Sequence, residues 1–93
     1  MKVNITKGFR DKLTAQVAFI AKDKPAAARK FKNDIVAKIK ELPTNSYVHR
    51  KSIFFDREDI RDLVYKRYVV VYKINEKLQT IEVFGFVKWQ NKL

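Results

Sequence analysis

The sequence has no cysteine, one histidine, two glycines and two prolines among its 93 residues. Without cysteine, neither a disulfide nor thiolate chemistry is available, which is compatible with a reducing compartment. The single His49 excludes the common His/Cys metal sites, and Gly8 and Gly85 are too far apart to form a glycine-rich phosphate loop. We therefore expect no metal or other cofactor, and we expect His49 to be an exposed loop residue.

Long apolar runs are also missing. No segment is long and apolar enough to span a bilayer, and the N-terminus lacks the apolar core of a signal peptide. The hydrophobic share of 46% and the aromatic share of 13% are typical of a globular domain. The sequence therefore predicts one soluble, cytoplasmic domain over residues 1–93, without a membrane partner.

Positive charge is abundant: 21 Lys and Arg against 10 Asp and Glu give a net charge of +11. Such a chain favours an anionic partner, and either a phosphate backbone or an acidic protein meets this requirement. A solvated basic surface that only keeps the chain soluble is the alternative. The acids Asp56, Glu58, Asp59 and Asp62 crowd one segment, which we interpret as a turn that points away from any phosphate.

Two amphipathic helices are predicted after a short strand at Lys2 to Thr6. Thr6 is a suitable N-cap, and an apolar stripe follows at Phe9, Leu13, Val17 and Ile20. Phe19 lies off this stripe and needs a second packing surface or a partner. Pro25 suits the first turn of the next helix, and Pro43 should end it. The second stripe comprises Ala28, Phe31, Ile35, Ile39 and Leu42. The close spacing predicts an antiparallel helical hairpin.

The rest of the chain predicts strands, after a loop at residues 43–50. The expected strands are Lys51 to Asp56, Ile60 to Tyr65, Tyr68 to Asn75 and Thr80 to Val87. Because Tyr68 to Ile74 is apolar at nearly every position, this strand should be central and covered on both faces. The fold class is therefore α+β: an N-terminal strand, a helical hairpin and a mostly antiparallel four-strand run, with the helices on one face. The turn at Lys66-Arg67 lacks Gly or Asn, so the strand register stays open.

Cationic and aromatic side chains are the remaining candidates for chemistry. RNA cleavage by a neighbouring 2′-hydroxyl can use such residues, since cations offset the developing phosphorane charge and aromatic rings stack on bases. Arg61 could instead be ion-paired with Asp59 or Asp62, and Trp89 could cover an edge of the core. The candidates by position are Lys51, Arg61, Arg67, Lys73, Lys88 and Trp89. Three tyrosines are expected to be core or sheet aromatics, namely Tyr65, Tyr68 and Tyr72.

Several motifs resemble those of a toxin family. The segment Asp23-Lys24-Pro25-Ala26-Ala27-Ala28-Arg29-Lys30-Phe31 is similar to the D-x-P-x-A-A-x-x-F opening common in RelE/ParE toxins. Arg61-Asp62-Leu63 and Tyr68-Val69-Val70-Val71-Tyr72-Lys73-Ile74 resemble the R-x-L and Y-x-V-x-Y-x-I motifs of the family. The resemblance covers nearly the whole chain, and its motifs are somewhat closer to the ParE branch.

This resemblance implies the toxin of a bacterial type II toxin–antitoxin pair, neutralised by an acidic antitoxin encoded beside it. A partly disordered antitoxin segment would fold as it binds the basic toxin. We expect Phe19 and Trp89 to be antitoxin anchors, and we expect operator DNA to be bound only through the antitoxin.

The resemblance leaves two possible targets, because the two branches of the family act on different molecules. RelE-like toxins cleave mRNA on the ribosome, whereas ParE-like toxins poison DNA gyrase. RNA-cleaving relatives tend to carry basic residues where this chain has Val69, Ile60 and Asp62, which favours gyrase, although the strong basicity favours RNA. If the chain is a metal-free endoribonuclease, its catalytic candidates are Arg61, Lys73 and Lys88, and its target-binding candidates are Lys51, Arg67 and Trp89. A non-catalytic nucleic-acid-binding module, using the basic faces of both helices, is the third hypothesis.

Overall fold

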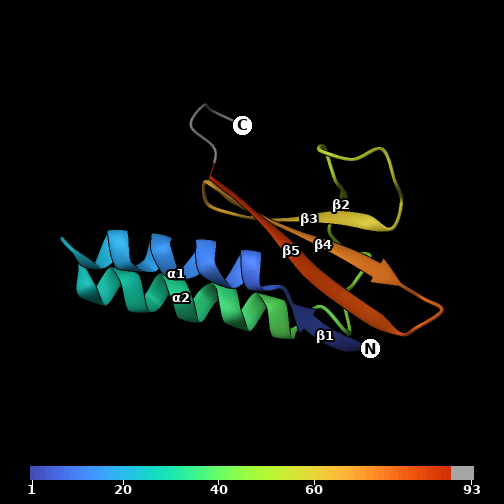
Figure 1. Ribbon diagram of the computed structural model, residues 1–93, viewed down its shortest axis with the longest axis horizontal. Helices are drawn as coiled ribbons and strands as arrows, with labels where there is room; N and C mark the ends of the chain where they lie inside the picture. Colours follow the sequence, from blue (N-terminus) through green and yellow to red (C-terminus); the bar gives the residue numbers. More distant parts are fainter. Residues whose placement is uncertain (89–93) are drawn as a thin grey trace.

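The computed structural model describes residues 1–88, which form a five-stranded sheet with a helical hairpin on one face (Figure 1). The order of elements is β1 (Lys2–Ile5), α1 (Lys7–Ala21), α2 (Pro25–Lys40), β2 (Arg50–Lys51), β3 (Ile60–Tyr65), β4 (Tyr68–Asn75) and β5 (Thr80–Lys88). In the sheet the strands lie in the order β1-β5-β4-β3-β2. The predicted α+β class is confirmed, while Trp89 lies outside the described residues.

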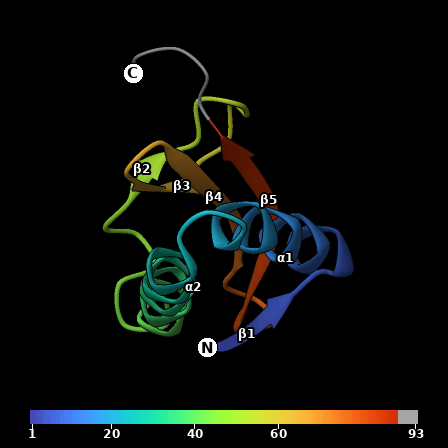
Figure 2. The same cartoon turned by 90° about the vertical axis from the view of Figure 1, so that its left-hand side faces the viewer.

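Local signals in the sequence explain both helices. The Thr6 hydroxyl accepts a hydrogen bond from the Phe9 amide at 3.2 Å, which caps α1, and Pro25 occupies the first turn of α2. Figure 2 shows the two helices side by side, as expected for a hairpin. Helix α2 ends at Lys40, before the last residue of the predicted stripe, yet Leu42 still reaches the core and is fully buried.

Strands β3, β4 and β5 are antiparallel, whereas β1 pairs with β5 in parallel. The register that the sequence left open places Tyr65 opposite Tyr68, with Lys66 and Arg67 in a two-residue turn. Lys66 takes a φ of 56°, a backbone conformation that costs energy for a residue with a Cβ atom. The hairpin therefore forms without the Gly or Asn that such turns favour.

A bulge in β5 requires glycine at position 85. The pairing shifts between Val71, which lies opposite Gly85, and Tyr72, which lies opposite Val83. A Cβ atom at Gly85 would lie 2.9 Å from the Cβ atom of Val71, closer than real side chains approach. The extra residue, Phe84, is placed on the face opposite the helices, where it packs beside Val71.

Both faces of β4 are covered, as its apolar sequence predicted. Towards the helices, Val70, Tyr72 and Ile74 join a core with Phe9, Phe31, Ile35, Ile39, Leu42, Leu63, Ile81, Val83 and Phe86. On the other face, Ile60, Val69 and Val71 form a smaller cluster with Phe84 and Val87. The Phe55 ring, from the segment before β3, lies 5.8 Å from the Phe84 ring and extends this cluster.

The predicted strand over Lys51 to Asp56 is wrong, because β2 comprises only Arg50 and Lys51. After the Ser52 amide donates to the Ile60 carbonyl at 2.9 Å, the chain leaves the sheet. The Ile53 amide then donates to the Asp62 carboxylate at 3.0 Å instead of to a neighbouring strand. We call residues 52–59 the β2–β3 loop. Side-chain acceptors compete here with the β-ladder, which strand propensity does not register.

Candidate functional site

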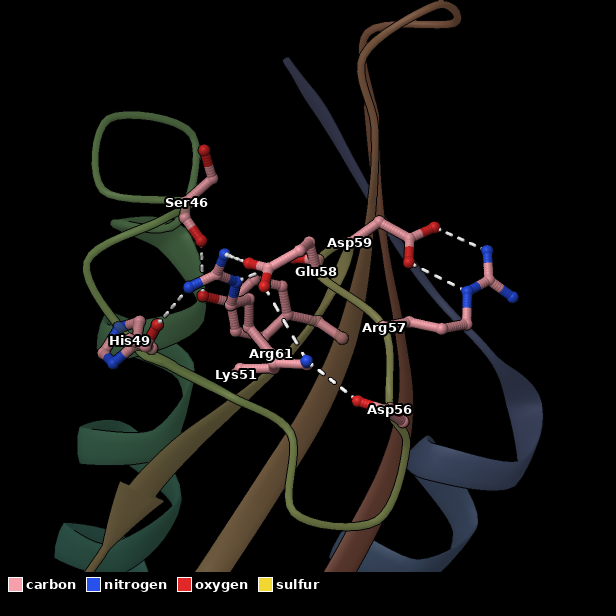
Figure 3. A network of polar contacts seen from close by, with 9 residues as sticks. Ser46, His49, Lys51, Asp56, Arg57, Glu58, Asp59 and Arg61 are labelled. Carbon is pink, nitrogen blue, oxygen red and sulfur yellow. Dashed lines mark hydrogen bonds and ion pairs between the residues drawn. The ribbon is translucent and has the colours of Figure 1, made fainter.

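Arg61 is fixed by a dense set of contacts near the start of β3 (Figure 3). Its guanidinium donates to the Glu58 carbonyl at 2.9 Å, to the Glu58 carboxylate at 3.0 Å and to the His49 carbonyl at 3.2 Å. It also lies 5.0 Å from the centroid of the Tyr47 ring. The side chain is only 14% exposed, so its charge holds two loops together. The acid that pairs with Arg61 is Glu58, rather than Asp59 or Asp62.

The acidic segment is paired with cations of its own. Lys51 contacts the Asp56 carboxylate at 2.9 Å and that of Glu58 at 3.7 Å, and Arg57 contacts Asp59 at 2.6 Å (Figure 3). The hydrogen bond from Lys51 lowers the pKa of Asp56, and the same contact raises the pKa of Lys51. The hydrogen bond from Arg57 lowers the pKa of Asp59. Lys51 is therefore engaged at the surface by carboxylates of the same chain and presents less charge to a target.

Asp62 does not belong to the exposed acidic turn in which the sequence placed it. It lies on β3 with its side chain buried, at 1% exposure, on the face opposite the helices. One oxygen accepts from the Ile53 amide at 3.0 Å and lies 3.5 Å from the Arg50 guanidinium. The other oxygen, Oδ1, has no hydrogen-bond partner among the described residues. Asp62 therefore anchors the β2–β3 loop to the sheet through one of its two oxygens.

The tyrosines of the central hairpin lie in or beside the core, as predicted. The Tyr72 hydroxyl donates to the Ser46 carbonyl at 2.6 Å, and the Tyr68 hydroxyl accepts from the Gln16 amide at 2.9 Å. The Tyr65 hydroxyl donates to the Asp34 carboxylate, which raises the pKa of Tyr65 to about 12. Burial also raises the pKa of Tyr72. A phenol held in its protonated form is a poor general base near neutral pH.

His49 is half-buried, not exposed as the sequence predicted. Its ring lies 6.1 Å from the Tyr72 ring at an angle of 87°, and burial lowers the pKa of the imidazole. The Arg61 guanidinium bonds to its backbone carbonyl rather than to the ring. The ring therefore packs against the end of the core, and packing alone accounts for its position.

The three catalytic candidates do not converge. Arg61 lies opposite Tyr72 and Lys88 lies opposite Tyr68, both on the helix side of the sheet. Tyr68 and Tyr72 are four positions apart on β4, so the two places are separated by roughly 13 Å along the strand. Lys73 follows Tyr72 directly and therefore points to the opposite face. No common point lies within hydrogen-bonding reach of all three.

The far end of the sheet carries an exposed aromatic beside a cation. Phe19 is 60% exposed, and the Lys88 ammonium lies 5.8 Å from its ring centroid and 6.0 Å from that of Tyr68. We call Phe19, Tyr68 and Lys88 the Phe19–Lys88 surface. Arg67, in the exposed turn between β3 and β4, is one residue from Tyr68 in the sequence. Two predicted contact residues, Phe19 and Arg67, and one catalytic candidate, Lys88, are thus exposed at this end of the molecule.

An apolar groove lies between β1 and the two helices, and sequence reasoning did not find it. Its volume is about 690 Å³, and we call it the β1 groove. It is lined by Met1, Val3, Ile5, Phe9, Arg10, Leu13, Thr14, Val17, Lys32, Val36, Ile39, Lys40 and Pro43. Several of these side chains belong to the stripes that predicted the helices. The stripes predict which face of each helix is apolar, but they do not predict that part of this face stays uncovered beside β1.

Exposed apolar residues on the β2–β3 loop were also missed. Ile53 is 54% exposed, and Phe54 and Phe55 are each 40% exposed. They were assigned to a strand, where alternate residues would have been buried. Of the residues that the structure describes, no group of three or more His, Cys, Asp or Glu side chains could hold a metal ion. None of the helices in this part of the chain is sufficiently long and apolar to cross a membrane.

The fold of this chain is similar to that of a solved structure. A solved structure described as the chromosomal ParDE TA system from P. aeruginosa superimposes with a TM-score of 0.77. The alignment covers 97% of both chains at 16% sequence identity, so this likeness concerns the fold alone. No curated protein matches the chain. The architecture is that of the RelE/ParE toxins, as the motifs suggested.

The family model of ParE toxins of type II toxin–antitoxin systems (parDE) matches residues 3–88. The chain therefore belongs to the ParE toxin family, and the predicted similarity to the ParE branch is confirmed. Membership of this family makes the chain a type II toxin and supports a cognate antitoxin as its partner.

Proposed function

We propose that this toxin arrests growth in the cytoplasm by binding DNA gyrase, and that it does not cleave RNA. The observation that carries the proposal is the environment of Ile60, Asp62 and Val69, where RNA-cleaving relatives tend to carry basic residues. All three side chains are buried, and the only charged one is negative. A phosphorane transition state needs accessible cations, so these positions offer it no stabilisation.

The placement of the other cations supports the same proposal. Arg61 is engaged with Glu58 and the His49 carbonyl, and Lys51 is engaged with Asp56. Lys73 points away from both Arg61 and Lys88. Metal-free RNA cleavage requires several groups within hydrogen-bonding reach of one phosphate. A toxin that acts by binding alone has no such requirement.

The Phe19–Lys88 surface is the proposed contact with the target and also an antitoxin anchor. Exposed aromatic and cationic side chains are typical of residues that contribute most to binding. Because Lys88 lies 5.8 Å from the Phe19 ring, an antitoxin segment packed on Phe19 would also cover Lys88. Neutralisation then follows from competition for one surface. Operator DNA is bound by the antitoxin within the complex.

Ribosome-dependent mRNA cleavage is the second candidate, and the net charge of +11 favours it. Charge of this size attracts ribosomal RNA without sequence preference. In this alternative, Lys88 and Arg67 would contact RNA beside Tyr68, and Arg61 and Lys73 would have to leave their present positions to join them.

A supercoiling assay with purified gyrase and antitoxin-free toxin tests the proposal. We expect inhibition by the native protein and about tenfold weaker inhibition by Lys88→Glu, because the charge at the contact is reversed. Lys77→Glu is the matched control, since Lys77 is exposed in the β4–β5 turn and the change in net charge is the same. Gyrase that stays fully active at toxin concentrations that arrest growth would exclude this target.

A further inference from the structure

Strand β3 separates two groups of charged side chains. Beside its start, acids of the β2–β3 loop are paired with cations of their own, as in the contacts of Asp56 with Lys51 and of Asp59 with Arg57. Beside its end, at the β3–β4 turn, most of the charged side chains are basic. The strand has six residues, so the two groups lie roughly 17 Å apart along it. The positive charge is therefore not spread evenly along the sheet.

Four cations from three parts of the chain gather at this end. We call them the basic end, which comprises Lys38, Lys66, Arg67 and Lys88. The Lys38 and Lys66 ammonium groups lie 5.5 Å and 5.3 Å from the centroid of the Tyr65 ring. Tyr65 pairs with Tyr68 across the hairpin. Lys88 lies opposite Tyr68 in β5, with its ammonium group 6.0 Å from the ring centroid. Contacts of this kind with aromatic rings hold the cations close together.

The charge of the basic end is not neutralised by the protein itself. Among residues 1–88, none of its four cations forms an ion pair with a carboxylate. The Asp34 carboxylate accepts hydrogen bonds from Lys30, at 2.9 Å, and from the Tyr65 hydroxyl. Lys66 and Arg67 are exposed in the β3–β4 turn, which Figure 1 shows beside the end of β5. Uncompensated cations on one small surface attract a polyanion.

The aromatic rings at this end favour a duplex over a single strand. Proteins that bind single strands expose several rings on which successive bases stack. Here the Tyr68 ring is stacked on Phe86, with centroids 5.4 Å apart at an angle of 9°, and the rings of both tyrosines also lie against Phe31. Phe19 alone is a largely exposed ring among the described residues of this surface. A duplex keeps its bases stacked inside and needs only cations for its phosphates.

We propose that the free toxin binds duplex DNA through the basic end, with its four cations on the phosphate backbone. Binding of this kind has no sequence preference and is separate from the recognition of operator DNA by the antitoxin. The choice of DNA rests on the proposed action on DNA gyrase, because duplex DNA is the substrate of that enzyme. Lys88 belongs both to the basic end and to the Phe19–Lys88 surface, so the contacts with DNA and with gyrase lie side by side. A toxin held on DNA meets gyrase at a raised local concentration.

Fluorescence anisotropy with a short labelled DNA duplex, at a series of salt concentrations and without gyrase, tests the inference. For four phosphate contacts, the logarithm of the binding constant should fall with the logarithm of the salt concentration with a slope of about −3.6. Lys38→Gln with Lys66→Gln removes two contacts, so the slope should become shallower by about 1.8 and binding about 20-fold weaker at about 0.2 M salt. A native protein without salt-dependent binding would overturn the inference.

Lys2→Gln with Lys77→Gln is the matched control. Both lysines are exposed at the other end of the sheet, since Lys2 begins β1 beside Gln79 and Lys77 is in the β4–β5 turn. This double variant removes the same charge and should leave the slope nearly unchanged. Thermal unfolding shows whether both double variants are folded. Equal losses of affinity in the two would mean that net charge alone attracts DNA, which would contradict a localised site.

NMR on the native protein locates the contact without any substitution. Adding the duplex should shift the amide resonances of Lys66 and Arg67 and leave those of Lys77 and Gln79 in place. Shifts of equal size at both ends of the sheet would overturn the assignment of the basic end.

Single-stranded RNA of the same length is the competing ligand. The duplex should bind about tenfold more tightly at low salt, because it releases more counterions for each phosphate contact. RNA that binds more tightly than the duplex would overturn the inference and make RNA the partner of the basic end.

Failure of this inference and failure of the proposed function have different signatures. A toxin that inhibits gyrase but does not bind the duplex leaves the proposed function intact and overturns the DNA contact. A toxin that binds the duplex through the basic end but does not inhibit gyrase supports the DNA contact and excludes gyrase as the target.

Discussion

The two faces of the sheet are held by different kinds of interaction. On the helix side, regular elements bury a continuous apolar core that includes Leu63, Val70 and Tyr72. On the other side, the irregular β2–β3 loop covers a small cluster and is held by ion pairs and by the buried Asp62. Apolar packing depends little on pH or salt, whereas exposed ion pairs depend on both. The helix side should therefore supply most of the free energy of unfolding. The side of the β2–β3 loop should account for any dependence of stability on pH and salt.

The largest expected effect is on the helix side. Leu63→Ala removes a fully buried side chain and should lower the free energy of unfolding by about 2–5 kcal/mol, measured by urea denaturation. Val64→Ala, on the opposite face of the same strand and 40% exposed, should cost less than about 1 kcal/mol. Similar losses for the two variants would contradict the unequal contribution of the faces.

The next effect concerns Asp62, which accepts a hydrogen bond from the Ile53 amide of the β2–β3 loop. Asp62→Ala leaves the Ile53 amide without its acceptor and should lower the free energy of unfolding by about 1–3 kcal/mol. Hydrogen exchange at Ile53 should become faster, while exchange in β4 should keep its pattern. Asp62→Asn retains an oxygen acceptor and should protect Ile53 better than alanine does. If Ile53 stays fully protected in the alanine variant, the loop is held by other contacts.

The smallest effect is a local response to acid. The hydrogen bonds from Lys51 and Arg57 lower the pKa values of Asp56 and Asp59 below their ordinary value of 3.8. Each ionised carboxylate therefore stabilises the folded loop fully when the pH is above 3.8. This stabilisation is lost as the pH falls below 3.8 and through the lowered pKa values. NMR shifts of the Phe55 amide should report the loop opening before the core responds. Asp56→Asn should remove the part of this acid response that comes from the Lys51–Asp56 ion pair. If the Phe55 amide shifts titrate in the same way in that variant, the ion pair does not contribute.

The sequence predicted the elements whose signals are local. Thr6, Pro25 and the two apolar stripes located both helices, and the continuous apolar run of β4 identified the central strand. The β2–β3 loop was assigned wrongly because its form depends on Asp62, which lies nine positions beyond Ile53 in the sequence. Strand propensity carries no information about such an acceptor.

The site was less accessible to sequence reasoning than the fold. Arg61, Lys73 and Lys88 have suitable side chains, but only the register shows that they lie on different faces and at different ends of the sheet. The register in turn depends on a turn with a positive φ at Lys66, which its composition does not suggest. The β1 groove is formed mainly by β1, α1 and α2, which follow one another in the sequence, but each sequence pattern describes one element and not how the three pack together.

Mapping of mRNA 5′ ends within minutes of inducing the toxin in a bacterial host tests the central claim most directly. Because Ile60, Asp62 and Val69 provide no cations for RNA cleavage, we expect intact messages together with arrested growth and a DNA-damage response. New 5′ ends that cluster in translated regions at a fixed codon phase would contradict the account and establish cleavage on the ribosome.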